Sequence, residues 1–219
     1  MAKEVKTMKN MFHLSFGEEV GNAISHGVPA ILCLFLLPIA AVYSYIVGGI
    51  SRAFGVSVFV LCLFLMFLIS CIYHSMAYDS QQKYIFRKLD HICILLAIAG
   101  SYTPIAITMI EGWEAVLILV IEWSMVLFGI LLKAIAKRSF PKLSMCIYMI
   151  MGWTAVFFLP KLLRVASPLF LGLIIGGGVM YTIGAFFYSH PQKKYFHMIW
   201  HFCIDMASIL HMIAIILVM

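Results

Sequence analysis

Charged residues are scarce in this sequence. Asp, Glu, Lys and Arg make up 11% of its 219 residues, whereas a soluble domain carries about 25%. Hydrophobic residues make up 64%, and the mean hydropathy is +1.05. A soluble domain of this size could not bury so much apolar surface, so lipid must act as solvent for most of the chain. We therefore predict an integral membrane protein.

Paired cysteines and a cleavable leader are also missing. The six cysteines are scattered through apolar stretches without CxxC spacing, which argues against a disulfide framework and a thiolate-rich metal site. No short apolar run with a small-residue cleavage site follows the N-terminal lysines, so the first helix itself should direct insertion. The net charge of +6 comes from short basic runs between apolar segments. That pattern is typical of membrane topology signals and excludes nucleic acid as the expected partner.

Seven apolar stretches are long enough to cross a bilayer, which needs roughly 20 residues per helix. They are continuous rather than alternating, so an all-α bundle is expected instead of a β-barrel. No linker divides the chain, and residues 1–219 are expected to form a single domain with residues 1–17 as a tail. The predicted spans are Asn22–Val47, Phe54–Met76, His91–Ile110, Ala115–Ala136, Leu143–Leu159, Pro168–Tyr188 and Phe196–Val218.

The basic residues indicate how the bundle is oriented. With seven spans, twelve of the fifteen lysines and arginines fall in the N-terminal tail and the loops on its side, and three fall on the other side. Because cytoplasmic loops are enriched in Lys and Arg, the N-terminus is predicted to be cytoplasmic and the C-terminus outside. A multi-pass protein of the cell membrane is expected.

Polar residues from four predicted helices collect at that cytoplasmic side. The first helix brings Glu18, Glu19, Asn22 and His26; the second Ser70 and His74; the third Asp90 and His91; and the seventh His197 and His201. Residues four apart lie on one face of a helix, so His197 and His201 can direct two imidazoles to one point. Ser70 and His74 are stacked in the same way.

Three histidines with a nearby carboxylate suit zinc, and a site with room for water is typical of catalytic zinc. Two other interpretations stay open at this point. A histidine at a helix end is often an interfacial or hydrogen-bonded core residue, and ionisable groups within membranes often form a proton or ion path.

These residues resemble the haemolysin III family. The resemblance rests on Ser70-Cys-Ile-Tyr-His74, Asp90-His91, Ala99-Gly-Ser-Tyr-Thr-Pro104 and His197-Met-Ile-Trp-His201. The opening Glu18-Glu-Val-Gly-Asn22 with Ser25-His26-Gly27 adds to it, and together the motifs extend from Glu18 to His211. This family is related to the adiponectin and progestin receptors and to the alkaline ceramidases.

The resemblance implies seven helices and an intramembrane Zn²⁺ held by His74, His197 and His201. It also implies that Asp90 orients the water and that Ser70 contacts the site. Its relatives suggest hydrolysis of a lipid amide or ester, with the bilayer and a lipid substrate or ligand as partners. A sensor or regulator with a structural zinc is the alternative. A channel-forming cytolysin, which the family name suggests, is less favoured because the outer loops are short.

Two carboxylates depart from the family's pattern. Asp205 lies one turn beyond His201, where it is expected to accept a hydrogen bond from a ligating histidine or to be a polar residue in a wet cavity. Glu122 lies in the outer half of the fourth predicted helix and is expected to face the bundle. The run Gly176-Gly177-Gly178 in the sixth helix is typical of close helix packing.

Overall fold

A computed structural model describes residues 13–135 and 141–219. Within these residues every regular element is helical, and six helices are long and apolar enough to cross a membrane. The elements are α1 (Phe16–Ser75), α2 (Gln81–Ile105), η1 (Ala106–Ile110), α3 (Gly112–Ile135), α4 (Pro141–Trp153), η2 (Thr154–Phe158), α5 (Leu159–Val165), α6 (Pro168–Tyr188), α7 (Phe196–Met212) and η3 (Ile213–Val218).

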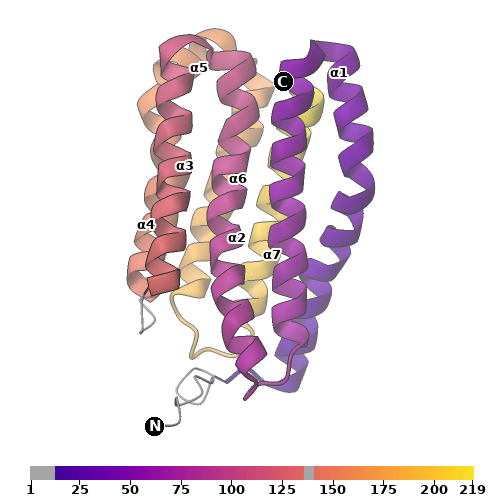
Figure 1. Cartoon of the computed structure of the whole chain (residues 1–219), viewed down its shortest axis with the longest axis vertical. Coiled ribbons are helices and arrows are strands. Elements are labelled where there is room, and N and C mark those ends of the chain that lie inside the picture. Colours follow the sequence, from indigo (N-terminus) through magenta and orange to yellow (C-terminus); the bar gives the residue numbers. More distant parts are fainter. Residues whose placement is uncertain (1–12, 136–140) are drawn as a thin grey trace.

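The 60 residues of α1 form two arms that fold back on each other at Gly49 (Figure 1). Gly49 has φ 73° and ψ −165°, a conformation essentially restricted to glycine. The arms pack closely, because a Cβ atom added at Gly27 would lie 3.0 Å from Cys71 Sγ. The fold therefore returns the end of α1 to the level at which it begins.

The other helices run up and down beside these arms, with short connections (Figure 1). The extensive packing of α1 on α2, of α6 on α7 and of α1 on α7 places the first and last helices side by side, with the start of α1 and the end of η3 at opposite ends of the bundle (Figure 1). Three irregular segments continue longer spans: π-helical η1 extends α2, π-helical η3 extends α7, and 3₁₀-helical η2 joins α4 to α5. Tyr102 is tied to this junction, since its hydroxyl accepts a 2.9 Å hydrogen bond from the Ala155 amide.

Two helices begin earlier than the predicted spans. α1 starts at Phe16 because Ser15 and Glu18 form a capping box, and α2 starts at Gln81 because the Ser80 side chain accepts a hydrogen bond from the Lys83 amide. Because these first turns are polar, a prediction from hydropathy assigns them to loops and not to helices. Residues 16 and 17 of the predicted tail are therefore helical, and residues 1–12 lie outside the described part.

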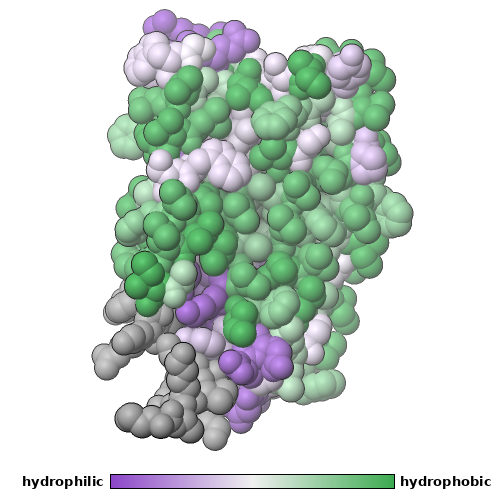
Figure 2. Space-filling model, in the orientation of Figure 1, coloured by the Kyte–Doolittle hydropathy of each residue, from purple (hydrophilic) through white to green (hydrophobic). Residues whose placement is uncertain are grey.

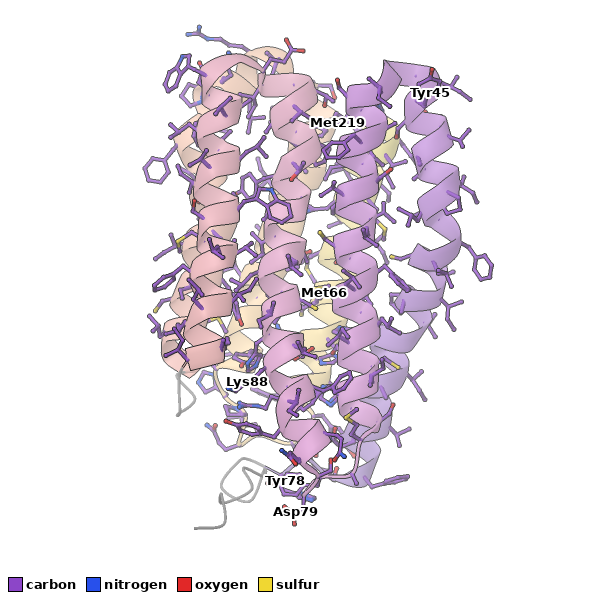
Figure 3. All side chains as sticks on the ribbon, in the orientation of Figure 1. Tyr45, Met66, Tyr78, Asp79, Lys88 and Met219 are labelled. Carbon is purple, nitrogen blue, oxygen red and sulfur yellow. The ribbon has the colours of Figure 1, made fainter. Side chains whose placement is uncertain are left out.

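Apolar side chains cover the face seen in Figure 2 between two polar ends. Many large hydrophobic residues are exposed on the outside of the helices, among them Ile39, Phe157 and Leu217. Figure 3 places Tyr78 and Asp79 at the end where α1 meets α2, and Tyr45 and Met219 at the opposite end. The broad apolar belt is what a lipid environment requires of a helical bundle.

Candidate metal centre

Three histidines from the ends of two helices meet inside the bundle. His74 ends α1, while His197 and His201 lie one turn apart at the start of α7. One ligand atom from each lies within 4.8 Å of the others, and the ring centroids are 5.0 to 5.2 Å apart. The predicted convergence of these side chains is thus present in the structure.

The Nε2 atoms of His74, His197 and His201 are buried, and no described residue hydrogen-bonds to them. A buried polar atom without a partner is costly and calls for an explanation. The ligand atoms of these three residues lie within 4.8 Å of one another, so the group could hold a cation. The donor set fits zinc, which takes neutral imidazole nitrogens and leaves a fourth position to water in open sites.

Glu19 holds His74 in the orientation that a metal needs. Glu19 Oε2 lies 2.6 Å from His74 Nδ1. An ionised carboxylate only accepts hydrogen bonds, so Nδ1 carries the proton and Nε2 presents its lone pair. A carboxylate behind a ligating imidazole is the usual outer partner in metal sites.

Ser25 fixes His201 in the same tautomer. Its hydroxyl donates to the Asn22 carbonyl over 2.9 Å, and its oxygen lies 3.1 Å from His201 Nδ1. The single hydroxyl proton is engaged with Asn22, so Ser25 accepts from Nδ1 and leaves Nε2 of His201 unprotonated. His201 is fully buried, at 0% exposure.

Two adjacent carboxylates at the start of α1 join the helices that carry the site. Glu19 Oε1 accepts a 2.7 Å bond from Lys83 Nζ at the start of α2, and Lys83 also donates to the Met76 carbonyl. Glu18 Oε1 accepts a 2.7 Å bond from the amide of Tyr195, which precedes α7 in a left-handed conformation. The opening turn of α1 therefore fixes the positions of both histidine-bearing helix ends.

Asp90 and Ser70 lie together beside the cluster. Both are buried, and the Ser70 side chain lies close enough to the Asp90 carboxylate to influence it. Ser70 is one turn before His74 on α1, so the α2 carboxylate lies near the histidine-bearing end of α1. The structure thus puts the two residues in mutual contact.

His91 follows Asp90 in sequence but takes no part in the three-histidine group. Its Nδ1 lies 3.3 Å from Lys133 Nζ, and its Nε2 lies 3.3 Å from Tyr188 Oη. Both ring nitrogens are thereby engaged. Neighbouring residues on a helix point about 100° apart, which separates His91 from Asp90.

Asp205 approaches a histidine outside the cluster. Its Oδ1 lies 3.8 Å from Nε2 of His26, and the His26 ring stacks on His201 with centroids 3.7 Å apart. Asp205 therefore reaches the site only through His26. Glu122, at 0% exposure, faces the interior of the bundle as predicted.

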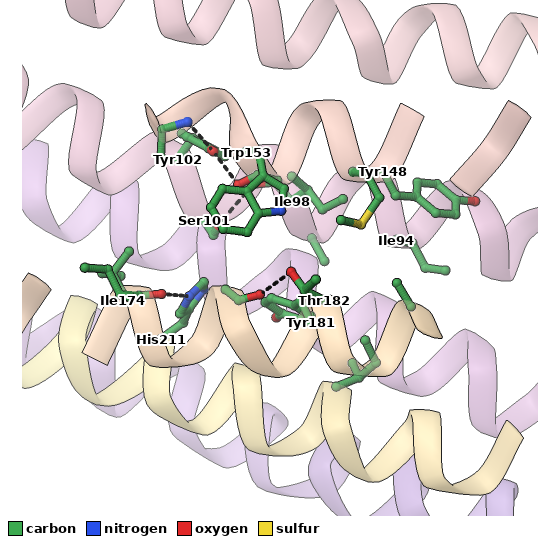
Figure 4. A pocket seen from close by; sticks show the side chains of 18 of the residues that line it. Ile94, Ile98, Ser101, Tyr102, Tyr148, Trp153, Ile174, Tyr181, Thr182 and His211 are labelled. Atoms are coloured by element: carbon green, nitrogen blue, oxygen red, sulfur yellow. Dashed lines mark hydrogen bonds between the residues drawn. The ribbon is translucent and has the colours of Figure 1, made fainter. Parts of the chain in front are cut away.

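A cavity of about 400 Å³ extends from this region between α2, α4, α6 and α7. Its wall includes His26 and Asp90 at the metal end and His211 farther along α7. Figure 4 shows Ile94, Ile98 and Ile174 lining it, with Tyr148, Tyr181 and His211 among them. The volume and largely apolar lining are typical of a site for an apolar ligand with few polar contacts.

The bundle and its buried histidines define a helical membrane protein with a group that could hold a metal ion. The family model described as Haemolysin-III related matches residues 14–212. The chain is 34% identical to Hemolysin-3 of Bacillus cereus over 184 residues, covering 84% of each chain. It is 31% identical to a Hemolysin-3 homolog of Bacillus subtilis (strain 168), covering 84% of this chain and 86% of that one. The chain belongs to the haemolysin III family.

Proposed function

We propose that this protein crosses the cell membrane seven times, with its N-terminus in the cytoplasm and its C-terminus outside. A straight 60-residue helix would be about 90 Å long, three times the roughly 30 Å hydrocarbon core. The turn at Gly49 divides α1 into two spans, which with the five later spans makes seven. The distribution of lysine and arginine supports the orientation.

The topology is tested with alkaline phosphatase fusions, since this reporter is active only outside the cytoplasm. A fusion after Met219 is expected to be active and one after Tyr78 inactive, with equal expression of the two proteins. An inactive fusion at the C-terminus would contradict the proposed orientation or the count of seven.

We further propose a zinc-dependent hydrolase that cleaves amides or esters of lipids. The observation that carries this proposal is the set of three unpartnered, buried Nε2 atoms beside Asp90 and the apolar cavity. A structural zinc site would close four protein ligands, whereas three histidines leave one position for water or substrate. The cavity gives the hydrocarbon tail of a lipid a place to lie while its polar bond reaches the histidines.

His74, His197 and His201 would hold the zinc, which when bound lowers the pKa of water from 15.7 toward about 7 and polarises a carbonyl. Asp90 accepts a hydrogen bond from the attacking water, takes up its proton, and returns that proton to the leaving nitrogen or oxygen as the C–N or C–O bond breaks. Ser70 orients Asp90 and can donate to the oxygen that develops charge. Ile94, Ile98 and the other apolar residues of the cavity wall exclude water from the tail.

Hydrolysis is tested on protein purified in lipid nanodiscs and loaded with zinc, using a panel of N-acyl lipids and lipid esters. Wild type is expected to cleave at least one member of the panel. His201→Ala and chelation should each abolish cleavage, whereas His190→Ala, which lies outside the cluster, should not. Cleavage that survives both His201→Ala and chelation would refute the proposal.

A sensor with a structural metal is the second candidate. It is favoured by one observation: the histidines come from the end of α1 and the start of α7, so a metal would pin these helices together. In that case metal would raise thermal stability without turnover of any lipid in the panel. A cytolytic pore, the third candidate, would instead release dye from liposomes that contain the purified protein.

A further inference from the structure

Lys133, His91 and Tyr188 form a hydrogen-bonded row that crosses from α3 through α2 to α6. Lys133 Nζ lies 3.3 Å from His91 Nδ1, and His91 Nε2 lies 3.3 Å from Tyr188 Oη. Ser144 Oγ, 2.6 Å from Lys133 Nζ, fixes the ammonium group at the start of the row. The hydrolysis proposed above assigns no role to these three side chains.

The donor and the acceptor of each hydrogen bond in this row can be assigned. A lysine ammonium donates hydrogen bonds and has no acceptor, so Nδ1 of His91 must accept. A neutral imidazole that accepts at Nδ1 carries its proton at Nε2, and that proton is donated to Tyr188 Oη. The hydroxyl proton of Tyr188 is therefore not used by His91 and is available for another acceptor.

Tyr188 is placed so that its hydroxyl proton can be offered to a ligand in the cavity. It is part of the cavity wall together with Asp90. Its ring packs against Trp200, with centroids 4.7 Å apart, and lies 6.1 Å from the ring of His197. Among the described residues, His91 is the hydrogen-bond partner of Tyr188 Oη.

We propose that Tyr188 donates its hydroxyl proton in a hydrogen bond to the carbonyl oxygen of a lipid amide or ester bound in the cavity. The inference rests on the hydrolysis proposed above. As water attacks the carbonyl carbon, its oxygen gains negative charge, and a donor fixed in advance stabilises that charge. Lys133 and His91 act as positioning residues. Because Lys133 donates to Nδ1 of His91, the imidazole donates to Tyr188 and does not accept the hydroxyl proton of Tyr188.

Tyr188→Phe removes the hydroxyl and keeps the ring against Trp200. Tyr45→Phe is the matched control, because Tyr45 is exposed near the opposite end of the bundle and is not part of the cavity wall. For Tyr188→Phe we expect kcat to fall about 100-fold, with KM and zinc content within a factor of two of wild type. Tyr45→Phe should stay within a factor of two in kcat.

A second measurement does not need turnover. The affinity of the zinc-loaded protein for a saturated fatty acid, whose carboxylate offers oxygen acceptors, should fall about tenfold in Tyr188→Phe and stay unchanged in Tyr45→Phe. Lys133→Met frees His91 to accept from Tyr188 and should weaken binding, whereas Lys133→Arg keeps the donor and should restore it.

The outcomes separate this inference from the proposed hydrolysis. If wild type binds the fatty acid but cleaves no lipid, hydrolysis is refuted. The ratio of the fatty-acid affinities of wild type and Tyr188→Phe would still decide whether Tyr188 donates to the ligand. Equal affinity and equal kcat in wild type and Tyr188→Phe would overturn the Tyr188 inference alone. Failure of zinc-loaded wild type both to bind the fatty acid and to cleave any lipid of the panel would overturn both.

Discussion

Glu19 and His74 lie 55 positions apart in the sequence, yet Glu19 Oε2 is 2.6 Å from His74 Nδ1. The contact joins the first turn of α1 to its last turn across the reversal at Gly49. It fixes the proton of His74 on Nδ1, and the lone pair of Nε2 then faces the other two histidines. Glu19 thus prepares the site although it is not one of the proposed ligands.

Glu19→Gln should weaken zinc binding by about ten- to 100-fold, the usual effect of losing an outer partner of a metal ligand. The amide keeps the size of the side chain but removes the charge that orients His74. Zinc affinity is measured by competition with a chelator in detergent. Glu114→Gln, at the far end of the bundle, is the control and should bind zinc like wild type.

Lys83 is 1% exposed and donates to Glu19 over 2.7 Å. Lys83→Met should destabilise the protein by about 3 kcal/mol, because it leaves a half-buried carboxylate without its lysine partner. Unfolding in a denaturing detergent measures the change. The double variant Glu19→Gln, Lys83→Met should lose less than the sum of the single variants, and strict additivity would contradict a coupled pair.

Zinc should stabilise the fold whether or not it is catalytic. At a free concentration 100 times its Kd, a ligand of the folded state contributes about 2.7 kcal/mol. The melting temperature of wild type should therefore rise with zinc and fall on chelation. His197→Ala should lose this response, and a zinc-dependent shift of equal size in that variant would place the metal elsewhere.

Gly177 allows α6 and α7 to approach each other. A Cβ atom there would overlap the His211 ring and lie 3.2 Å from the Ala207 carbonyl oxygen. Gly177→Ala should destabilise the bundle by about 1 to 3 kcal/mol. Gly178→Ala is the neighbouring control, since nothing lies within 4 Å of its added Cβ atom, and it should be neutral or slightly stabilising because alanine favours helix.

Glu122 carries two buried carboxylate oxygens that have no ion-pair partner and make no short hydrogen bond among the described residues, although the Thr154 side chain lies nearby. Replacing a buried, unpaired carboxylate by an apolar side chain of similar volume removes a desolvation penalty. Glu122→Met is therefore expected to stabilise the protein by about 1 kcal/mol or more in the same unfolding assay. Destabilisation would indicate that Glu122 has a polar partner when the protein lies in a membrane.

The histidine cluster could be predicted because local spacing carries most of the information. His197 and His201 are one turn apart, and the lysine and arginine distribution puts His74 at the same side of the bundle. The structure brings these three side chains together. The run of three glycines correctly indicated close packing, although the sequence could not say that Gly177 alone requires it.

The outer partners could not be predicted, because they depend on contacts without a periodic signal. Ser25 reaches His201 across 176 positions, and Glu19 reaches Lys83 across 64. Adjacency in sequence was also a poor guide: His91 follows Asp90, but the turn of α2 directs it to Lys133 and Tyr188. Only the packing of α1 against α2 and α7, and of α2 beside α3 and α6, decides these pairs.

The bond from Glu18 to the Tyr195 amide spans 177 positions of the chain. During synthesis, Glu18 and Glu19 enter the membrane long before α7 has left the ribosome. The three histidines can meet only after the last helix has inserted and turned its first residues toward the first helix. The histidine cluster is therefore the last part of the bundle to form, and the proposed metal could bind in full only to the complete chain.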